Sequence, residues 1–326
     1  MADTSAHIVF YIPAALAEAA PHATSHHSCL EKLVARGDTR TSALRGDAQL
    51  LELFGGDASA GTARAAVSHH AQNGGSDVIQ WRIIASPAHL VADHATLHFP
   101  PQHHAPLSDA ESRALLAACQ DHFALEGWQL DYGDAQSWYL RLSDTTAITT
   151  TSLADAVGAP LFEALPQGAD ARTWRRWLNE VQMLFHSHAV NEARTKRGLT
   201  PVNSLWFWGE GSLPVLTAQP FTHVFGGDLY VQGLARLSGA AWSALPEGMA
   251  ALDASAVQGT VLVVLDEETD SSWDAQWFCP LSERLKSFPN VAMNFHNGYV
   301  THLDRKQLWR FWRRKHYSIA IRMSAP

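Results

Sequence analysis

The feature that most constrains this fold is an apolar stripe between residues 174 and 188. Its members recur at the spacing of one helix face: Trp174, Trp177, Leu178, Val181, Leu184, Phe185 and His188. A helix with so wide an apolar face has to bury it against another layer of structure. After this helix, Gly198 is expected to stop the helical region, and the apolar run 205–208, closed by Gly209 and Gly211, is expected to form a strand.

Polar residues beside and after the stripe suggest a binding site. His188, Asn191, Arg194 and Asn203 stand where their side chains could converge. Amides near one guanidinium suit a small anion, because Arg offers a planar fork to carboxylate or phosphate oxygens. The sequence therefore predicts a candidate site for a phosphorylated or carboxylate small molecule. The alternative is that these side chains cap helix ends and order turns, since Asn and His often bond to loose backbone groups there.

The same residues carry a resemblance to a known family. Leu178-Asn179-Glu180, then the pattern H-x-V-N-x-x-R-x-x-x-G-L-x-P-x-N from His188 to Asn203, then Gly209-Glu210-Gly211, resemble the archaeal-type cofactor-independent phosphoglycerate mutases of the alkaline phosphatase superfamily. Segments 148–160 and 231–239 are similar to the same family. The overall layout also resembles a bacterial branch labelled regulatory protein of RpfE type.

This resemblance implies an α/β fold with an alkaline-phosphatase-like three-layer core, formed by residues 1–80 and 213–326. Residues 81–212 would form an inserted α+β cap domain. The apolar runs 7–12 and 260–265 are typical of strands buried in a parallel sheet, and segments 128–132 and 137–142 alternate as paired antiparallel strands do.

The resemblance also implies that groups needed for phosphoryl transfer are missing. In the resembled enzymes the first strand ends in a metal-binding aspartate, and here that position is Pro13. The nucleophile position is Gly46, and Trp273 stands where the family carries a histidine after Asp270. We therefore expect a protein with no catalytic residues and no cofactor, which binds an anionic metabolite in a regulatory role.

The alternative is an active metal-dependent mutase or phosphatase with a rearranged site. Its ligands would come from Asp47, His223, Asp266, Asp270 and His296, and would hold Mn²⁺ or Zn²⁺. The acidic segment 266–270 directly follows a buried strand, and ligands bind at the carboxyl ends of strands in open α/β sheets. The other interpretation of this segment is a solvated acidic loop.

Composition limits the classes of function. The chain has 326 residues, of which 46% are hydrophobic and 17% charged, so it can form two packed domains. The net charge of -8 argues against binding nucleic acid through bulk charge. The basic and aromatic segment 308–316 is interpreted as a terminal helix whose tryptophans pack on the core, although such a segment can also bind single-stranded nucleic acid or a membrane surface.

The spacing of the cysteines and histidines does not match a known metal-binding pattern. Cys29, Cys119 and Cys279 lie far apart without C-x-x-C spacing, which argues against a zinc ribbon or a disulfide framework. Together with the absence of a signal-like start or an apolar run of membrane-spanning length, this predicts a cytoplasmic protein without a membrane partner. The histidine pairs 26–27, 69–70 and 103–104 are expected to lie in solvated loops. A protein partner is unknown.

Overall fold

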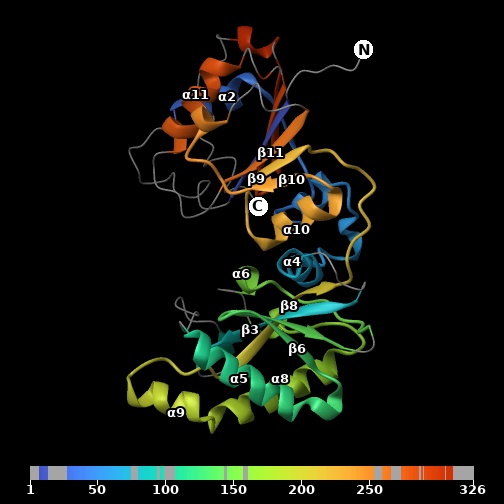
Figure 1. Ribbon diagram of the computed structural model, residues 1–326, viewed down its shortest axis with the longest axis vertical. Coiled ribbons are helices and arrows are strands. Elements are labelled where there is room, and N and C mark those ends of the chain that lie inside the picture. Colours follow the sequence, from blue (N-terminus) through green and yellow to red (C-terminus); the bar gives the residue numbers. More distant parts are fainter. Residues whose placement is uncertain are drawn as a thin grey trace. The chain divides into compact units, whose positions relative to one another are not determined.

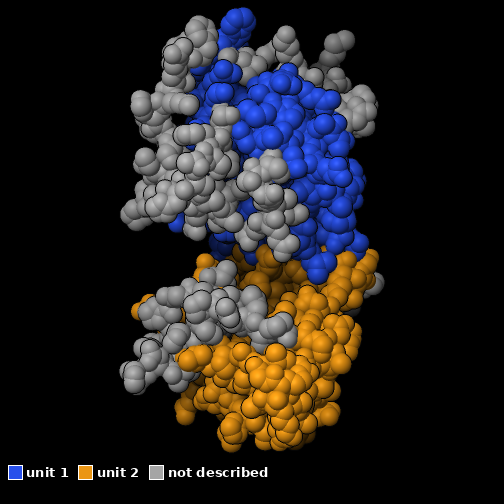
Figure 2. All heavy atoms as spheres, turned by 90° about the vertical axis from the view of Figure 1, so that its left-hand side faces the viewer, with its two compact units in different colours: residues 1–59, 215–326 blue, residues 60–214 orange. Residues whose placement is uncertain are grey.

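The computed structural model describes residues 7–13, 28–74, 80–93, 96–98, 107–142, 145–156, 161–252, 259–265, 273–285, 288, 290–304 and 306–310. The chain forms two compact units, coloured in Figure 2: residues 1–59 with 215–326, and residues 60–214. The sequence places the boundaries of the inserted domain after residues 80 and 212. Helix α4 (Arg64–Gln72) packs on strands of the second unit, so the first boundary lies earlier along the chain.

The first unit is built on a seven-stranded sheet (Figure 1). Its order is β10 (Ala241–Ser243), β9 (His223–Gly226), β11 (Thr260–Val264), β1 (His7–Ile12), β12 (Asn290–Phe295), β13 (Tyr299–Asp304) and β2 (Asp38–Thr41). The strands from β10 to β12 pair in parallel, and β13 is antiparallel to both of its neighbours. The predicted strands at 7–12 and 260–265 are therefore confirmed.

Helices cover both faces of this sheet. Helix α2 (Ser28–Arg36) and the π-helical turn η4 (Asp274–Phe278), which continues into α11 (Cys279–Arg284), share one apolar core with β1, β11 and β12. Helix α10 (Leu229–Ser238) connects β9 to β10, in the opposite direction along the sheet. Because βαβ crossovers are right-handed, α10 belongs to the other face, which completes three layers. Helix α3 (Gly46–Leu53) follows β2.

The second unit contains a four-stranded antiparallel sheet in the order β6 (Gln129–Asp134), β7 (Ser137–Arg141), β3 (Arg82–Ala88) and β8 (Ser204–Gly211). Helices α5 (Asp109–His122) and α8 (Ala171–His186) cover one face through a core rich in tryptophan, and α4 lies on the other (Figure 1). This unit also contains a hairpin, β4 (Val91–Asp93) and β5 (Thr96–His98), the short helices α6 (Leu153–Ala156) and α7 (Leu161–Ala164), and helix α9 (Ala189–Lys196). In the part of the chain described, no helix combines the length and apolar character needed to cross a membrane.

The apolar stripe is buried as predicted, but it belongs to a shorter helix. Trp174, Trp177, Leu178, Val181 and Phe185 are buried on α8, and Leu184 is partly buried. The helix ends at His186, and His188 caps the next helix, α9, by accepting a hydrogen bond from the Val190 backbone amide. A capping residue has extended backbone angles, which is why one continuous helix through His188 does not form. Gly198 follows α9 with a φ of +71°, as expected for a helix stop.

Strand β3 contains a proline although it lies inside the sheet. It runs from Arg82 through Pro87 to Ala88. Strand β7 pairs only with Arg82–Ala85, so at Pro87 the strand has a ladder partner on the β8 side alone. The missing amide hydrogen of proline is tolerated there.

One histidine pair is also misassigned. His69 and His70 lie on α4 and are buried, with exposed fractions of 3% and 8%, whereas the sequence predicts solvated loops. The pairs 26–27 and 103–104 lie outside the described residues. Of the segment 308–316 only the first residues are described. Trp309 is 75% exposed, which contradicts the predicted packing of this tryptophan, and Arg310 pairs with Asp38 at 2.6 Å.

Candidate functional site

The positions that the resemblance links to metal binding and to the nucleophile can be located at the carboxyl edge of the parallel sheet. Strand β1 pairs with both β11 and β12, so the three strands end side by side. The backbone amide of Leu265 donates to the Tyr11 carbonyl at 3.1 Å, and that of His296 donates to the Ile12 carbonyl at 2.9 Å. The residues that follow these strands therefore meet at one edge, where α/β proteins place their ligands.

Gly46 and His296 lie against each other at this edge. The Gly46 amide donates to the His296 carbonyl at 3.0 Å, and a Cβ at Gly46 would lie 3.2 Å from the imidazole Cε1. Nδ1 of His296 is 3.1 Å from the Tyr11 hydroxyl. Gly46 has a φ of +54°, a conformation that glycine adopts readily and other residues rarely do. At the position that the resemblance assigns to the nucleophile, the chain thus presents only backbone.

Two other positions have no ligand atom for a metal. Pro13 is buried directly after β1, and proline has no side-chain donor. Trp273 is 1% exposed and packs in the core between the sheet and α11. Its side chain contributes to stability through burial.

The residues of the alternative metal site are only partly brought together. His296 lies at the carboxyl edge, and Asp47 is half-buried in the first turn of α3, next to Gly46. His223 begins β9, three residues before the end of that strand, or about 10 Å from the carboxyl edge. It hydrogen-bonds to the Ser243 hydroxyl at 2.9 Å, and burial lowers the pKa of its imidazole. Asp266 and Asp270 lie outside the described residues.

A different set of possible metal ligands appears elsewhere. Among the described residues, one group of three or more such side chains has its ligand atoms close together: Cys29, Asp274 and Cys279. The two cysteines form a disulfide, with their Cα atoms 5.1 Å apart. The expectation that the chain has no disulfide is therefore wrong, and the cysteines no longer support a cytoplasmic location.

The candidate ligand-binding residues of the second unit hydrogen-bond to the protein itself. Asn191 is 5% exposed; its amide nitrogen donates to the carbonyls of Phe185 (2.7 Å) and Val202 (2.6 Å), and its oxygen accepts from the Val202 amide (2.9 Å). Asn203 makes a similar pair of bonds, both at 2.8 Å, with the amide and carbonyl of Leu90. These contacts fix the loop between α9 and β8 to its surroundings.

The two remaining candidates also contact protein groups. Arg194 is fully buried, donates through Nε to the Thr200 carbonyl at 2.9 Å and pairs through Nη1 with Glu111 at 3.1 Å. His188 caps α9. The geometry of all four residues supports the interpretation in which they cap helices and order turns. An anionic ligand at these residues stays a prediction.

The glycines of the family-like pattern have a packing role. Gly209 and Gly211 lie in β8 with φ values of +68° and +144°, where the pairing with β3 shifts register. A Cβ at Gly211 would lie 2.8 Å from that of Ala63, just before α4. This β-bulge lets the start of α4 approach the strand closely.

The sequence did not indicate a polar cluster in the second unit, in which the buried side chains of His69 and Arg82 face the 47% exposed carboxylate of Asp131. Nε2 of His69 lies 3.2 Å from Oδ2 of Asp131, and Arg82 is 3.9 Å from the same carboxylate. The hydrogen bond with His69 lowers the pKa of Asp131, and burial opposes it.

The sequence also did not indicate the disulfide, which joins residues 250 positions apart. One signal was present: each cysteine belongs to the helical segment after one of two neighbouring parallel strands, β1 and β11.

The fold is similar to those of two solved structures. The structure of the PH0037 protein from Pyrococcus horikoshii superposes with a TM-score of 0.50 at 13% sequence identity, covering 92% of this chain and 87% of that one. A cofactor-independent phosphoglycerate mutase from Thermoplasma acidophilum gives a TM-score of 0.45 at 14% identity, with coverage of 92% and 89%. The chain has an alkaline-phosphatase-like α/β fold.

Local sequence similarity is to 2,3-bisphosphoglycerate-independent phosphoglycerate mutases. The chain is 33% identical over 72 residues, 22% of its length, to that enzyme of Methanothrix thermoacetophila. It is 28% identical over 124 residues, 37% of its length, to a probable enzyme of this kind from Geobacter sulfurreducens. These matches span 18% and 30% of the two relatives, well under two thirds of their length. No protein-family model matches the chain.

Proposed function

We propose that this chain is a phosphoglycerate-mutase-like protein that keeps the fold, does not transfer phosphoryl groups and binds an anionic metabolite in a regulatory role. The observation that carries the proposal is Gly46. It faces His296 at the carboxyl edge of the sheet and has no side chain to attack phosphorus.

The chemistry explains why this absence matters. A phosphoryl group moved by covalent catalysis needs a nucleophilic oxygen, and metal ions need carboxylate and imidazole ligands to be held beside it. At the described positions the chain offers Gly46, the buried Pro13 and the core residue Trp273. Among the described candidate ligands, His296 and Asp47 remain at this edge, and one imidazole with one carboxylate does not by itself form a two-metal site.

The regulatory part of the proposal comes from the layout of the sequence alone, which resembles the branch labelled regulatory protein of RpfE type. The expected ligand is a phosphorylated or carboxylate small molecule, and 3-phosphoglycerate is the natural first probe because the relatives are named phosphoglycerate mutases. A cytoplasmic location is part of the same proposal.

The full chain should be purified, loaded separately with Mn²⁺ and Zn²⁺, and assayed for interconversion of 3- and 2-phosphoglycerate. We expect no turnover above a metal-free blank, while a cofactor-independent mutase assayed in parallel turns over. Metal-dependent turnover that disappears on chelation would establish the alternative, an active enzyme with a rearranged site.

Calorimetric titration with 3-phosphoglycerate tests the binding role separately. If the ligand binds at the family-like segment, His188→Ala weakens binding, whereas Met183→Ala, an exposed position on α8 outside that segment, leaves it unchanged. Absence of binding by 3-phosphoglycerate and by other phosphorylated or carboxylate metabolites would remove the regulatory part and leave the loss of catalysis standing.

A further inference from the structure

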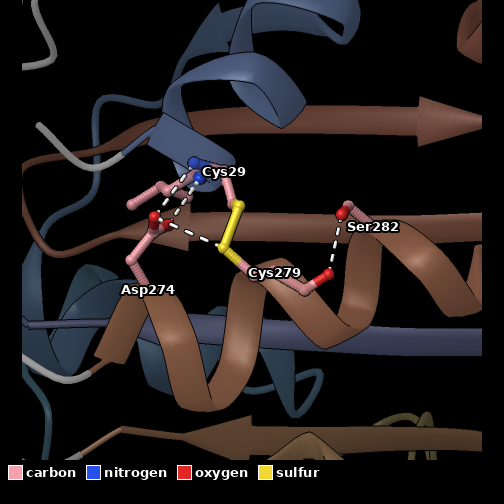
Figure 3. Close-up of a disulfide and its surroundings, with 5 residues drawn as sticks. Cys29, Asp274, Cys279 and Ser282 are labelled. Atoms are coloured by element: carbon pink, nitrogen blue, oxygen red, sulfur yellow. Dashed lines mark hydrogen bonds between the residues drawn. A yellow bond between two sulfur atoms is a disulfide. The ribbon is translucent and has the colours of Figure 1, made fainter.

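The disulfide joins two segments that are far apart in the chain. Cys29 lies in the first turn of α2 and Cys279 is the first residue of α11, and 250 positions separate them. Figure 3 shows the bond bridging the two helical segments beside Asp274. The two segments follow β1 and β11, so the bond connects the two crossovers that leave neighbouring strands of the sheet.

Asp274 holds the same junction through hydrogen bonds. Its carboxylate accepts from the backbone amides of Cys29 at 3.0 Å and Leu30 at 2.8 Å, and one of its oxygens is 3.6 Å from Sγ of Cys279 (Figure 3). A carboxylate at the start of a helix is stabilised by the free amides and by the helix dipole. Asp274 therefore keeps α2 and η4 together whether or not the sulfurs are bonded, so the junction can survive reduction.

Exposure distinguishes these cysteines from the third one. Cys29 and Cys279 are partly exposed, so a small thiol can reach the bond. Cys119 is fully buried on α5, and burial raises the pKa of its thiol well above the ordinary range. Since the thiolate is the reactive form, Cys119 is chemically silent in the native protein.

We propose that Cys29–Cys279 is a thiol–disulfide exchange site that takes a dithiol reductant and controls whether α2 and α11 are covalently linked. A reductant thiolate attacks one sulfur, the bond between the cysteines breaks, and a mixed disulfide forms while the other cysteine leaves as a thiolate. The second thiol of the reductant then attacks the mixed disulfide and releases the remaining cysteine. Two electrons pass to the protein, its two thiolates take up protons, and the reductant becomes a cyclic disulfide.

The Cys29–Cys279 bond links helices that follow two neighbouring strands of the sheet. Pro13 and Leu265, which follow β1 and β11, lie at the carboxyl edge that holds Gly46 and His296. The disulfide links α2 covalently to α11, so reduction leaves the hydrogen bonds of Asp274 to hold α2 and η4 together. This inference does not depend on the proposed function, because it concerns the crosslink and not catalysis.

A metal site is the competing interpretation of the same side chains. Two ligands of a tetrahedral Zn²⁺, at about 2.3 Å for sulfur and about 2.1 Å for oxygen, lie about 3.6 Å apart. The separation of Sγ of Cys279 and the Asp274 oxygen, 3.6 Å, matches this geometry. The bond between the sulfurs and the two amides on the carboxylate favour the crosslink in the structure as it stands.

The test counts thiols in the native full-length protein. Protein purified without reductant should show no reactive thiol until it is denatured, when Cys119 alone reacts. Native protein treated with dithiothreitol should show two reactive thiols, and oxidised dithiothreitol or glutathione should remove them again. Reduction should lower Tm by roughly 5 to 10 °C, because the crosslink restricts the unfolded chain.

Matched variants identify the bond. Cys29→Ser with Cys279→Ser should abolish the Tm difference between reduced and oxidised samples, and Cys119→Ser should keep it. Three thiols that no oxidant converts, or a bond reducible only after unfolding, would overturn the proposal. So would stoichiometric Zn²⁺ binding by the reduced protein that the Cys29→Ser variant lacks, since the pair would then be a metal site.

Discussion

The buried guanidinium of Arg194 donates to Glu111 at 3.1 Å, across 83 positions of the chain. Glu111 also closes the capping box of α5, because its carboxylate accepts from the Ser108 amide while the Ser108 hydroxyl accepts from the Glu111 amide. One carboxylate therefore holds the start of α5 and the end of α9 together.

Removing the buried member of the pair should destabilise the second unit strongly. Arg194→Ala leaves the Thr200 carbonyl and the Glu111 carboxylate without this donor, and we expect a loss of about 3–5 kcal/mol of unfolding free energy. Arg197 is the matched control: it pairs with the same Glu111 at 3.2 Å, but its side chain is 56% exposed. Arg197→Ala should lose about 1 kcal/mol or less. Urea unfolding of both variants decides the matter, and equal losses would contradict the assignment.

Stability should depend on pH through Glu111. Burial would raise the pKa of this carboxyl, but hydrogen bonds from Ser108 and the charges of Arg194 and Arg197 outweigh it and hold the pKa below the ordinary value of 4.5. A carboxyl whose pKa is lower in the folded state stabilises the fold above pH 4.5, and the contribution disappears as pH falls through the lower value. The wild type should lose more stability than Glu111→Gln between about pH 6 and about pH 3. Parallel pH curves would count against this role.

Replacing the side-chain amide of Asn191, which donates two hydrogen bonds, should lower the free energy of unfolding. In Asn191→Asp the shape is kept, but a carboxylate oxygen would face the carbonyls of Phe185 and Val202. We expect a loss of about 3 kcal/mol, since a buried group is left unpaired and repelled. Asn179→Asp, at an exposed position of α8, should change stability by about 0.5 kcal/mol or less. Chemical denaturation of the two variants measures the difference.

Placing a serine hydroxyl at position 46 should destabilise the protein and should not create mutase activity. Gly46→Ser combines a φ of +54° with a Cβ only 3.2 Å from the His296 ring, so strain and crowding add. Gly198→Ser has a similar φ of +71° with nothing within 4 Å, and it isolates the backbone term of about 1–2 kcal/mol. We expect Gly46→Ser to be destabilised by about 1 kcal/mol more than that, and to gain no mutase activity. Activity in this single variant would show that the metal site is intact.

Periodicity in the sequence was enough to find the main elements. The apolar runs at 7–12 and 260–265 form neighbouring parallel strands, and the stripe on α8 is buried, because continuous or helically spaced apolar residues have few ways to leave water. Helix α4 was missed because His69 and His70 look like loop residues, and only the sheet of the second unit provides their buried surroundings.

Some properties of the candidate site also follow from residue types alone, and others depend on tertiary contacts. The sequence by itself determined which chemical groups are absent at Pro13 and Gly46, since side-chain chemistry is a property of the residue type. Only the tertiary structure decided that Arg194 pairs with Glu111, that Gly46 faces His296 and that Cys29 bonds Cys279. These contacts join residues 83 to 250 positions apart, and no local pattern encodes which distant side chain will be brought within reach when the layers pack.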